Sequence, residues 1–558
     1  MRRIAAASVA LPTLAFYASL GSTSFLTRPI YYAAVITSWT LCFWAWATYR
    51  IILRPKFLSS LRSLPEPTGR SWWNGFASRE FHGMKGGHIA KWYCRQHTLR
   101  HDGMFRYLGI LNSERIAVTT KEGVAELARR YQYDFPKTKM LEKLAEPIIG
   151  RGLVIVNGDE HKRQRRLLTP VFAMKHMRDL EPTFWAKSVE VSDKFDEIVE
   201  KTAAASGFSA PIDIDFYTGL VGLDIISKAA LGTDYRSIQD PNSELVANYR
   251  ECFEPTTLFR FIAILRLVVP DMFIKALPLK RVQSGLKAIA LLHSSFHREI
   301  RTKKSLMKQG KLTSNDIISL LIRDRHCEDE DELVIHMLTM LGAGHETVAV
   351  SITWAMYEFA RRPEWQRSVR REIRSRLPSP RSGGAPQYSD LEHESMPLLN
   401  AFVSEILRYW PAIPLTSRTA AHDTTLQGVF VGETTKVCVS IVGFNRDPAN
   451  WGPTARTFDP SRWLTHDEAT GRDTFDSTGG ALHKTAFQTF FHGQRACIGR
   501  TFARHEMLNV LSCWIGRMDF VLTDVTQMDE NNIEISGGGI TSRPLQPIYV
   551  NARRVEGW

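Results

Sequence analysis

The longest stretch with helical spacing of apolar residues covers positions 240–375, and its most apolar part is DELVIHMLTMLGAGHETVAVSITWAMYEFARR at 331–362. A helix that is apolar on most sides must lie inside a shell of other elements. The same spacing at 161–205 and 395–409 predicts helices that can form this shell. Short strands are predicted at 104–120, as a hairpin, and at 537–550. The predicted fold class is therefore mainly α with small β-sheets.

Two glycines and three polar residues interrupt the central helix. Gly342 and Gly344 each cost a helix about 1 kcal/mol relative to alanine. The polar residues His345, Glu346 and Thr347 lie beside them in a segment that is otherwise apolar. One interpretation is close packing against a neighbouring helix, which small residues permit. The other is a functional site, because departures from local rules concentrate where function is located.

The charge balance limits the kinds of partner. The chain of 558 residues has 71 Lys and Arg against 58 Asp and Glu, a net charge of +13, which favours a membrane surface, an acidic protein or nucleic acid. The basic clusters at 161–166 and 361–376 lack interleaved aromatic residues and zinc-finger spacing, so nucleic acid is the weakest of the three. The seven cysteines lie far apart without a metal-like spacing, which suits a reducing cytosolic side.

The N-terminal region predicts a membrane anchor. Positions 30–49 contain no charged residue, and a helix of that length spans a bilayer core. Aromatic residues crowd its second half, and four basic residues follow at Arg50, Arg54, Lys56 and Arg62. Because positive residues flank the cytosolic end of a membrane helix, we expect the rest of the chain to be cytosolic.

An earlier apolar segment at 4–20 has two interpretations. It is shorter, contains Pro12 and follows two arginines, as in a signal peptide. A second apolar segment follows at once, however, and a two-helix hairpin would leave both basic flanks in the cytosol, so we favour the hairpin over a single span. The predicted anchor is therefore positions 1–59, with one or two transmembrane helices at about 4–20 and 30–52.

The segment FFHGQRACIGR at 490–500 places one cysteine between two glycines and two arginines. A lone cysteine is most often a buried, inert thiol. Gly493 and Gly499, however, permit a tight turn and close backbone approaches. Arg495 and a helix that starts near Gly499 are expected to lower the pKa of the Cys497 thiol, which favours the anion that a metal requires. The segment alone does not decide between an inert thiol and a metal ligand.

Two further segments are unremarkable on their own. In SEILRYWP, Glu405 and Arg408 lie three positions apart on one helix face, where an exposed ion pair contributes little to stability. FDPSRW places Arg462 in a loop. The meaning of both depends on the other motifs.

Four segments in order resemble the motifs of the cytochrome P-450 family, the haem-thiolate monooxygenases: AGHET at 343–347, EILR at 405–408, FDPSRW at 458–463 and FFHGQRACIG at 490–499. The last segment matches every specified position of the family signature F-x-x-G-x-R-x-C-x-G. The resemblance extends over nearly the whole chain. It implies the cytochrome P-450 fold, a helix-rich haem domain at 60–558 that follows the membrane anchor.

The resemblance implies a role for each residue of the signature. Cys497 would be the axial thiolate ligand of the iron of haem b, and Phe490 would pack beside the haem. Gly493 and Gly499 would shape the loop. Arg495 would contact a haem propionate, since a guanidinium can bind a carboxylate through two parallel hydrogen bonds.

Three more residues are implied to contact propionates. Arg418 in PLTSR is one of them. In GDEHKRQRRLLTPVF, His161 stands where many family members carry tryptophan, and Arg165 follows four positions later on the same helix face. Because an imidazole can donate a hydrogen bond as an indole does, His161 remains a candidate.

The central helix carries the chemistry that the resemblance implies. Thr347 and Glu346 match the alcohol and the acid that help to deliver protons to iron-bound dioxygen. Ala343 and Gly344 match the groove in which dioxygen fits beside the helix. A buried network that supports the haem-side core is implied as well, made of Glu405, Arg408 and Arg462.

The implied activity is that of a monooxygenase which inserts one oxygen atom from O2 into a hydrophobic substrate by hydroxylation, epoxidation or multistep oxidation. Electrons would come from NADPH through a separate NADPH–cytochrome P-450 reductase, with cytochrome b5 as a second candidate, because the chain has no nucleotide-binding glycine fingerprint. The anchor implies the endoplasmic reticulum membrane, with the catalytic domain facing the cytosol. The motifs are most similar to those of fungal members that act on terpenoids or polyketides in secondary metabolism.

Three alternatives remain open at this point. The first is a fatty-acid or xenobiotic hydroxylase, which differs only in substrate. The second is a haem-thiolate isomerase or dehydratase that does not use O2, and the third is a non-catalytic haem-binding membrane protein. The presence of both Glu346 and Thr347 argues against the last two, because neither needs protons delivered to dioxygen.

Overall fold

A computed structural model gives the fold of the chain. The predicted apolar segment at 4–20 and Cys94 lie outside the residues that it describes. Those residues are 28–76, 103–130, 133–203, 207–253, 265, 269, 271–275, 277, 279–324, 327–469, 471–536 and 540–558.

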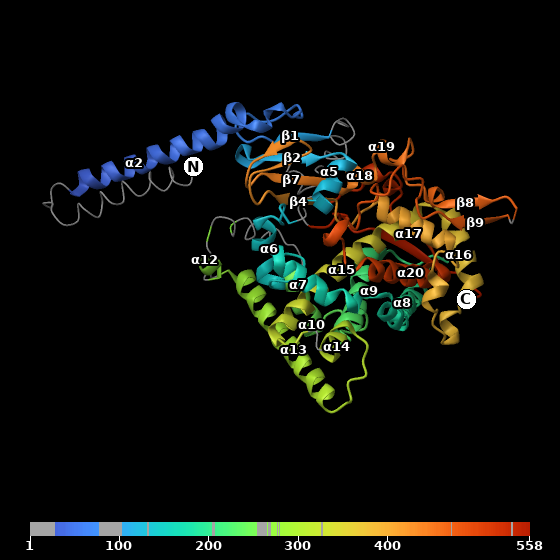
Figure 1. Cartoon of the computed structure of the whole chain (residues 1–558). Helices are drawn as coiled ribbons and strands as arrows, with labels where there is room; N and C mark the ends of the chain where they lie inside the picture. The colour runs from blue at the N-terminus through green and yellow to red at the C-terminus, as the bar shows by residue number, and fades with distance from the viewer. Residues whose placement is uncertain are drawn as a thin grey trace.

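Helix α2 (Arg28–Thr48) continues without a break into the π-helical turns of η1 (Tyr49–Leu58), so the helix predicted near 30–52 extends further at its C-terminal end. It projects away from the body of the molecule as a long rod (Figure 1). Among the described residues, the helix that is long and apolar enough to cross a membrane is α15 (Glu330–Arg361), and 61% of its apolar window is buried inside the protein. The length and hydropathy of α2 therefore do not by themselves establish that it spans a membrane.

A four-stranded sheet lies where this rod joins the body (Figure 1). Its strand order is β1-β2-β7-β4. The predicted hairpin at 104–120 is confirmed as the antiparallel pair β1 and β2, and β2 pairs in parallel with β7. The strands are β1 (Met104–Leu108), β2 (Glu114–Val118), β4 (Leu415–Thr419) and β7 (Lys436–Ser440).

The tip of the hairpin fastens η1 to the sheet. Asn112 is fully buried and adopts a positive φ of 52°, a conformation that asparagine tolerates better than most residues. Its side-chain amide donates hydrogen bonds to the backbone oxygens of Ile51, at 2.9 Å, and Trp72, at 3.1 Å. The rod and the sheet are therefore joined by direct contacts.

Helix α15 is the central element of the helical body, as its apolar sequence predicts. The carboxylate of Asp329 caps its first turn by accepting from the backbone N–H of Asp331, and three acidic residues in that turn complement the helix dipole. The helix ends before Pro363, which starts the next one. It packs against α9 (Ile214–Ile226) and α20 (Arg500–Arg517).

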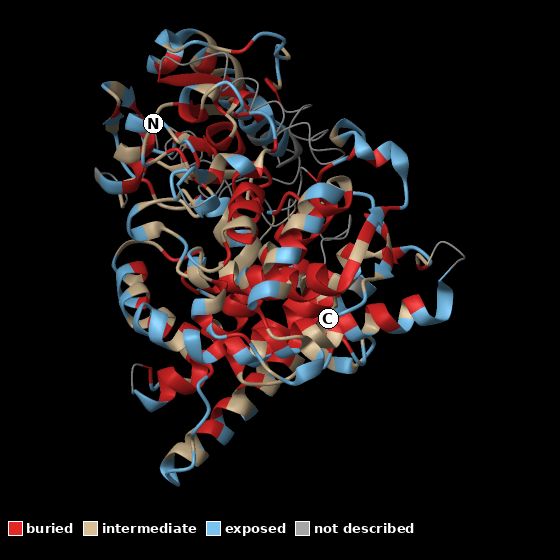
Figure 2. Ribbon diagram, turned by 90° about the vertical axis from the view of Figure 1, so that its right-hand side faces the viewer, coloured by how far each residue is buried: buried red, intermediate tan, exposed pale blue. Residues whose placement is uncertain are grey.

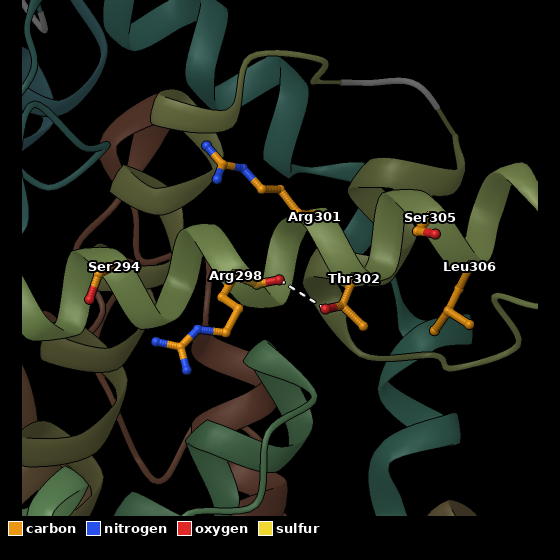
Figure 3. A pocket seen from close by; sticks show the side chains of 6 residues that line it. All are labelled: Ser294, Arg298, Arg301, Thr302, Ser305 and Leu306. Atoms are coloured by element: carbon orange, nitrogen blue, oxygen red, sulfur yellow. Dashed lines mark hydrogen bonds between the residues drawn. The ribbon is translucent and has the colours of Figure 1, made fainter.

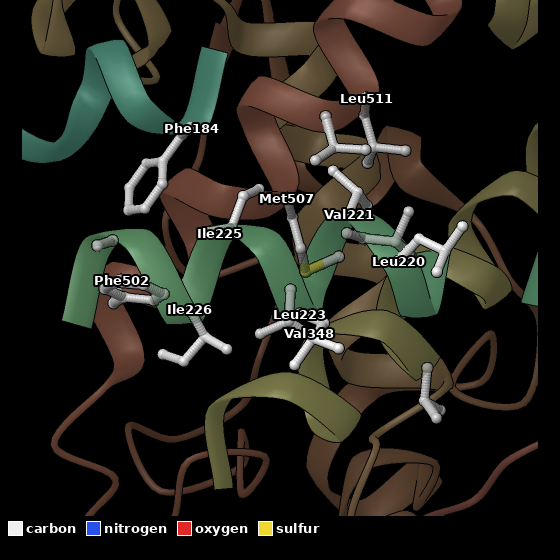
Figure 4. Packing of buried hydrophobic residues seen from close by; sticks show 14 of the residues in the cluster. Phe184, Leu220, Val221, Leu223, Ile225, Ile226, Val348, Phe502, Met507 and Leu511 are labelled. Carbon is white, nitrogen blue, oxygen red and sulfur yellow. The ribbon is translucent and has the colours of Figure 1, made fainter. Parts of the chain in front are cut away.

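Buried residues gather where these central helices cross (Figure 2). Figure 4 shows Ile226 and its neighbours on α9 between α15 and α20, with Phe502 and Met507 contributed by α20. A fourth helix, α8 (Met174–Thr202), packs along α20. These contacts give α15 the protein shell that its apolar sides require.

The remaining helices are arranged around this core. Within the described residues, the predicted helical run at 240–375 is divided into separate helices: Asp316 and Asp329 cap two of them, and Pro363 starts another. Their bounds are α5 (Lys121–Ala125), α6 (Lys139–Ile149), α7 (Gly158–Leu168), α10 (Glu244–Phe253), α12 (Asp271–Lys275), α13 (Lys280–Lys308), α14 (Ile317–Arg323), α16 (Pro363–Arg376), α17 (Pro397–Tyr409), α18 (Ile441–Asn445) and α19 (Pro448–Trp451).

Three small sheets complete the described part of the fold. The last strand begins at Tyr549, later than the sequence pattern at 537–550 predicts. The sheets pair β10 (Met518–Leu522), β11 (Tyr549–Arg554) and β3 (Ile212–Asp213); β5 (Thr424–Leu426) and β6 (Val429–Val431); and β8 (Leu464–Asp467) and β9 (Arg472–Phe475). The mainly α class with small sheets is confirmed.

Candidate active site

The loop that carries Cys497 is closed on itself just before α20. The backbone N–H of Cys497 donates to the carbonyl of Phe490 at 2.9 Å. Gly493 adopts a φ of +73°, and a Cβ there would lie 2.1 Å from the backbone oxygen of Ala128, so no other residue fits. Arg165 on α7 donates to the carbonyl of Ala496 at 2.6 Å. The loop is thus fixed by its own backbone and by α7.

Cys497 differs from the other cysteines that the structure describes. It is exposed, whereas Cys252, Cys327, Cys438 and Cys513 are buried and Cys42 lies half-buried in α2. The Cys438 sulfur, on the central strand β7, accepts a hydrogen bond of 3.1 Å from Tyr107. Only the Cys497 thiol among these residues is both exposed and presented by a constrained loop.

The expected lowering of the Cys497 pKa by Arg495 is wrong for the protein without a ligand. The residue is accessible to solvent, but protein atoms crowd its sulfur, and the resulting desolvation raises its pKa. This outweighs the opposite effects of the Gly499 N–H, Arg165 and Arg500. A bound metal ion would stabilise the thiolate.

A cluster of basic side chains lies near the Cys497 loop, and the pKa of each is lowered, first of all by burial. Burial and neighbouring cations lower the pKa of His161 to about 3 and that of Arg418 to about 10. They lower the pKa of Lys137 well below its usual value. Among the described residues, the groups that act most strongly on Lys137, Arg165 and Arg418 include no carboxylate. The basic cluster consists of Lys137, His161, Arg165, Arg418 and Arg495.

Several elements bring the basic cluster together. Lys137 and Arg418 face each other across an isolated β-bridge. His161 and Arg165 lie one turn apart on α7, and the His161 ring is 3.4 Å from the Tyr133 hydroxyl. Arg495 donates to Oδ1 of Asn157 at 3.1 Å. All four basic residues named from the sequence thus lie in one region.

Lys137 was missed by sequence reasoning. It follows Pro136 in a segment without helical or strand periodicity, and its place depends on pairing with a strand far along the chain. Nothing in the local sequence distinguishes Lys137 from any other basic residue in a loop. Its effect on the pKa of His161 identifies it as a member of the basic cluster.

Two functional groups on α15 have defined partners. The Thr347 hydroxyl donates back to the carbonyl of Ala343 at 2.9 Å, as a threonine within a helix often does. Oε1 of Glu346 accepts a hydrogen bond of 2.6 Å from the Thr541 hydroxyl, a partner that the sequence did not suggest. Ala343 itself is exposed.

The two glycines of α15 serve close helix packing. A Cβ on Gly344 would lie 2.7 Å from Cδ1 of Ile226 on α9, and one on Gly342 would lie 2.6 Å from Cε1 of Phe253 on α10. The groove for dioxygen that was expected at Gly344 is therefore occupied on that side by Ile226. Ala343, in contrast, remains open.

Glu405, Arg408 and Arg462 are brought together in one network of ion pairs. Arg408 binds Glu405 through two hydrogen bonds of 2.6 and 2.7 Å, and both side chains are fully buried. Arg462 Nε lies 3.3 Å from Oε1 of Glu405. Asn445 links this pair to the Cys497 loop, because it donates to the Arg408 carbonyl and accepts from the backbone N–H of Gln488.

The hollows on the described surface include two of several hundred cubic ångströms. A groove of about 640 Å³ lies beside the Cys497 loop, lined among others by Phe490, Lys484, Arg500 and Arg504. The second hollow lies along a single helix, α13, and is lined by Ser294, Arg298, Arg301, Thr302, Ser305 and Leu306 (Figure 3). One helix face cannot enclose a substrate. Neither hollow is lined by Cys497, the basic cluster or Thr347, so the candidate active site is defined by these side chains themselves.

Comparison with known proteins agrees with this arrangement. The cytochrome P450 family model matches residues 84–549. Cytochrome P450 monooxygenase buaD of Petromyces alliaceus is 36% identical over 517 residues, which cover 92% of this chain and 91% of the relative. Cytochrome P450 monooxygenase FUM15 of Gibberella moniliformis is 33% identical, with 90% of each chain covered. By the extent of these matches, the chain belongs to the cytochrome P450 family of haem-thiolate monooxygenases.

Proposed function

We propose that this cytochrome P450 inserts one oxygen atom from O2 into a hydrophobic small molecule, with Cys497 as the axial ligand of haem b. The observation that carries the proposal is the placement of one exposed cysteine beside a cluster of half-buried cations that repel one another. Buried charges are costly unless they are paired. A ligand that carries two carboxylates and a metal ion could bind the cysteine through the metal and pair the cations with its carboxylates.

The residues present fit haem b. Its two propionates would offset part of the positive charge of the basic cluster, and each cation that gains a carboxylate partner would recover a pKa nearer its usual range. Arg495, Arg418 and His161 are the proposed donors, with Lys137 added to them. A Cβ on Gly499 would meet no atom within 4 Å, so there is space beside the loop at this position.

When bound, thiolate-ligated haem supplies the activation of O2, favoured by electron donation from the sulfur. The chain's own residues would handle the protons. The Thr347 hydroxyl uses its hydrogen to bond Ala343, so its oxygen can accept from a water molecule. Glu346, the adjacent residue, would supply protons to that water while Thr541 holds its carboxyl in place. These roles favour a monooxygenase over an isomerase, a dehydratase or a non-catalytic haem protein.

An apolar substrate is favoured by the side chains that approach this part of α15. Phe253 and Ile149 would both contact a Cβ on Gly342, at 2.6 and 3.3 Å. Because the relatives reported above come from fungi, we propose a terpenoid or polyketide of fungal secondary metabolism as the substrate class. A fatty acid or a xenobiotic would fit the same apolar surroundings.

We propose that α2 anchors the protein in the endoplasmic reticulum membrane, with the catalytic domain in the cytosol. Large apolar side chains that a soluble protein would bury are exposed on this helix, including Trp39, Phe43, Trp44 and Trp46, each more than half exposed. Basic residues follow on the domain side, as expected for a cytosolic flank. Whether 4–20 forms a second span remains a prediction.

The groove beside the Cys497 loop is the proposed contact for an NADPH–cytochrome P450 reductase, with cytochrome b5 as a competing partner. Lys484, Arg500 and Arg504 line it and favour an acidic surface. Two cations of α7, in contrast, already have acidic neighbours: Lys162 lies 2.8 Å from Asp159, and Arg163 lies 2.7 Å from Glu332.

The reduced, carbon monoxide-bound protein tests the ligand assignment. We expect the thiolate-type absorption band in the wild type and in Cys438→Ala, which removes a buried cysteine on β7, and its loss in Cys497→Ala. A thiolate-type band that persists in Cys497→Ala would refute the assignment. Product formation in microsomes that requires NADPH, reductase and O2 together would separate the monooxygenase from the alternatives that do not use O2.

A further inference from the structure

The imidazole of His345 lies in a notch on α9 that two glycines create. Its Nε2 is 2.8 Å from the carbonyl oxygen of Gly219. A Cβ on Gly222, one turn further along α9, would lie 3.5 Å from Cδ2 of His345. Because glycine has no side chain, both positions leave room for the His345 ring of α15. A larger side chain at either position would reduce this space. His345 therefore joins the central helix to α9.

The protonation of this ring follows from its partners. A carbonyl oxygen only accepts hydrogen bonds, so Nε2 of His345 carries the hydrogen and donates to Gly219. Nδ1 then has a free lone pair, and it accepts from the hydroxyl of Tyr249 on α10. The two rings also meet edge to face, with centroids 5.0 Å apart. One neutral imidazole therefore connects α9, α15 and α10.

The surroundings keep His345 neutral. Burial lowers its pKa to about 4, and the cations Arg250 on α10 and Arg543 in the C-terminal segment act in the same direction. Glu506 of α20 lies on the other side of the Gly222 notch, and burial raises its pKa well above the usual range, which favours its neutral form. The hydrogen bond from Tyr249 thus persists through the physiological pH range.

A second contact holds α10 on the same turns of α15. Tyr249 stacks on Phe253, one turn later on α10, with ring centroids 4.8 Å apart. Phe253 in turn enters the space left by Gly342 on α15. The two contacts place α10 over positions 342–345, directly before the proposed proton-delivery residues Glu346 and Thr347.

We propose that the hydrogen bond between Tyr249 and His345 is a latch that fixes α10 over α15 and so limits the size of the substrate that reaches Thr347. Tyr249 and His345 are positioning residues in this scheme, since they act through the distance between two helices. The proposal rests on the proposed function only where it places the substrate beside Thr347. The latch itself is a property of the chain.

Hydrogen–deuterium exchange of the holoprotein tests the latch. Tyr249→Phe keeps the ring and its stacking but removes the hydroxyl, and we expect the amides of α10 to exchange about 3- to 10-fold faster, the effect of losing one buried hydrogen bond. Tyr357→Phe is the matched control, because it removes a buried hydroxyl that donates to the Gln527 carbonyl at 2.8 Å. Exchange in α10 that is equal in the wild type and Tyr249→Phe would overturn the proposal.

A second variant shows whether faster amide exchange in α10 comes from loss of this hydrogen bond or from a general loosening of the helix packing. His345→Phe keeps a ring in the notch but removes both nitrogens. If the two side chains act through one bond, Tyr249→Phe combined with His345→Phe should raise α10 exchange no more than His345→Phe alone. Full additivity of the two effects would contradict a shared bond.

Ligand binding tests the effect on size selection. Imidazole and 4-phenylimidazole bind haem iron and shift its Soret band, so their affinities compare a small and a larger occupant of the cavity. We expect Tyr249→Phe to improve binding of 4-phenylimidazole relative to imidazole by about 3- to 10-fold, and Tyr357→Phe to leave the ratio unchanged. An unchanged ratio in Tyr249→Phe would refute size selection. Absence of any Soret shift in the wild type would instead refute the haem assignment, while exchange still decides the latch.

Discussion

Thr541 donates a hydrogen bond of 2.6 Å from its hydroxyl to Oε1 of Glu346. This contact joins the C-terminal segment to the middle of α15. The segment is itself held firmly, because the carbonyl of Ser542 accepts from Nε1 of Trp354 at 2.8 Å and the Ser542 hydroxyl donates to Pro411 at 2.7 Å. The acid that we propose as a proton source is therefore oriented by residues almost two hundred positions away.

Replacing Thr541 by valine tests whether the Glu346 carboxyl must be held in one direction, in addition to being present. Valine keeps the shape of the side chain but cannot donate, so the Glu346 carboxyl loses a fixed direction. We expect product formed per NADPH consumed to fall about 3- to 10-fold, with unchanged haem content. Thr523→Val, which removes an exposed hydroxyl bonded to Asn551, serves as control and should leave coupling intact. Equal coupling in Thr541→Val would exclude an orienting role.

The hydroxyl of Thr347 should be required for coupling and dispensable for haem binding. In Thr347→Ala we expect the carbon monoxide spectrum to persist while reducing equivalents appear as hydrogen peroxide and product formation falls by about 10-fold or more. Thr353→Ala is a close control, because Thr353 makes the same bond to the carbonyl four residues before it, at 3.0 Å. If both variants released similar peroxide, loss of that helix bond would explain the effect instead.

Residues whose surroundings are local could be predicted from sequence. Gly493 is needed where the chain turns with positive φ against Ala128, and glycine is the residue that such a turn selects. Arg165 reaches the loop because it shares a helix face with His161, which spacing alone indicates. The order of the motifs then related these pieces to one family.

Features that depend on distant contacts could not be predicted. Lys137 enters the basic cluster through its bridge to Arg418. Gly344 faces Ile226, and nothing in the AGHET segment indicates which of its sides meets α9. The pKa of Cys497 is raised because burial outweighs the nearby cations. Each of these outcomes depends on tertiary packing, which sequence spacing does not define.

Loss of the glutamate should destabilise the protein more in the buried pair Glu405–Arg408 than in the exposed pair Glu197–Lys194. In Glu405→Gln the guanidinium of Arg408 would stay buried without its anionic partner, which costs about 3–5 kcal/mol of unfolding free energy. Glu197→Gln breaks an exposed pair, in which Lys194 lies 3.1 Å away, and should cost at most about 1 kcal/mol. Urea denaturation compares the two. Similar losses in both would show that Arg408 is satisfied by its backbone carbonyl partners alone.

The stability of the haem-free protein should fall as the pH is lowered, and His161 should contribute to this fall. His161 is 2% exposed, and burial together with Arg495 and Lys137 lowers its pKa to about 3 from 6.5. Between these two values the unfolded chain binds a proton that the folded chain does not, so acid favours unfolding. A propionate beside His161 would raise its pKa again, and the holoprotein should lose less stability over the same range.

Melting temperatures measured from about pH 7.5 to about pH 5 would resolve this effect. In the wild type, the haem-free protein should lose more stability on acidification than the haem-loaded protein. In His161→Gln, which removes the titrating group, the difference between the two forms should shrink. His345, whose pKa is also lowered, acts in the same direction, but it lies outside the basic cluster and should contribute equally to both forms. Parallel pH profiles for haem-free and haem-loaded wild type would mean that no carboxylate of the haem reaches His161.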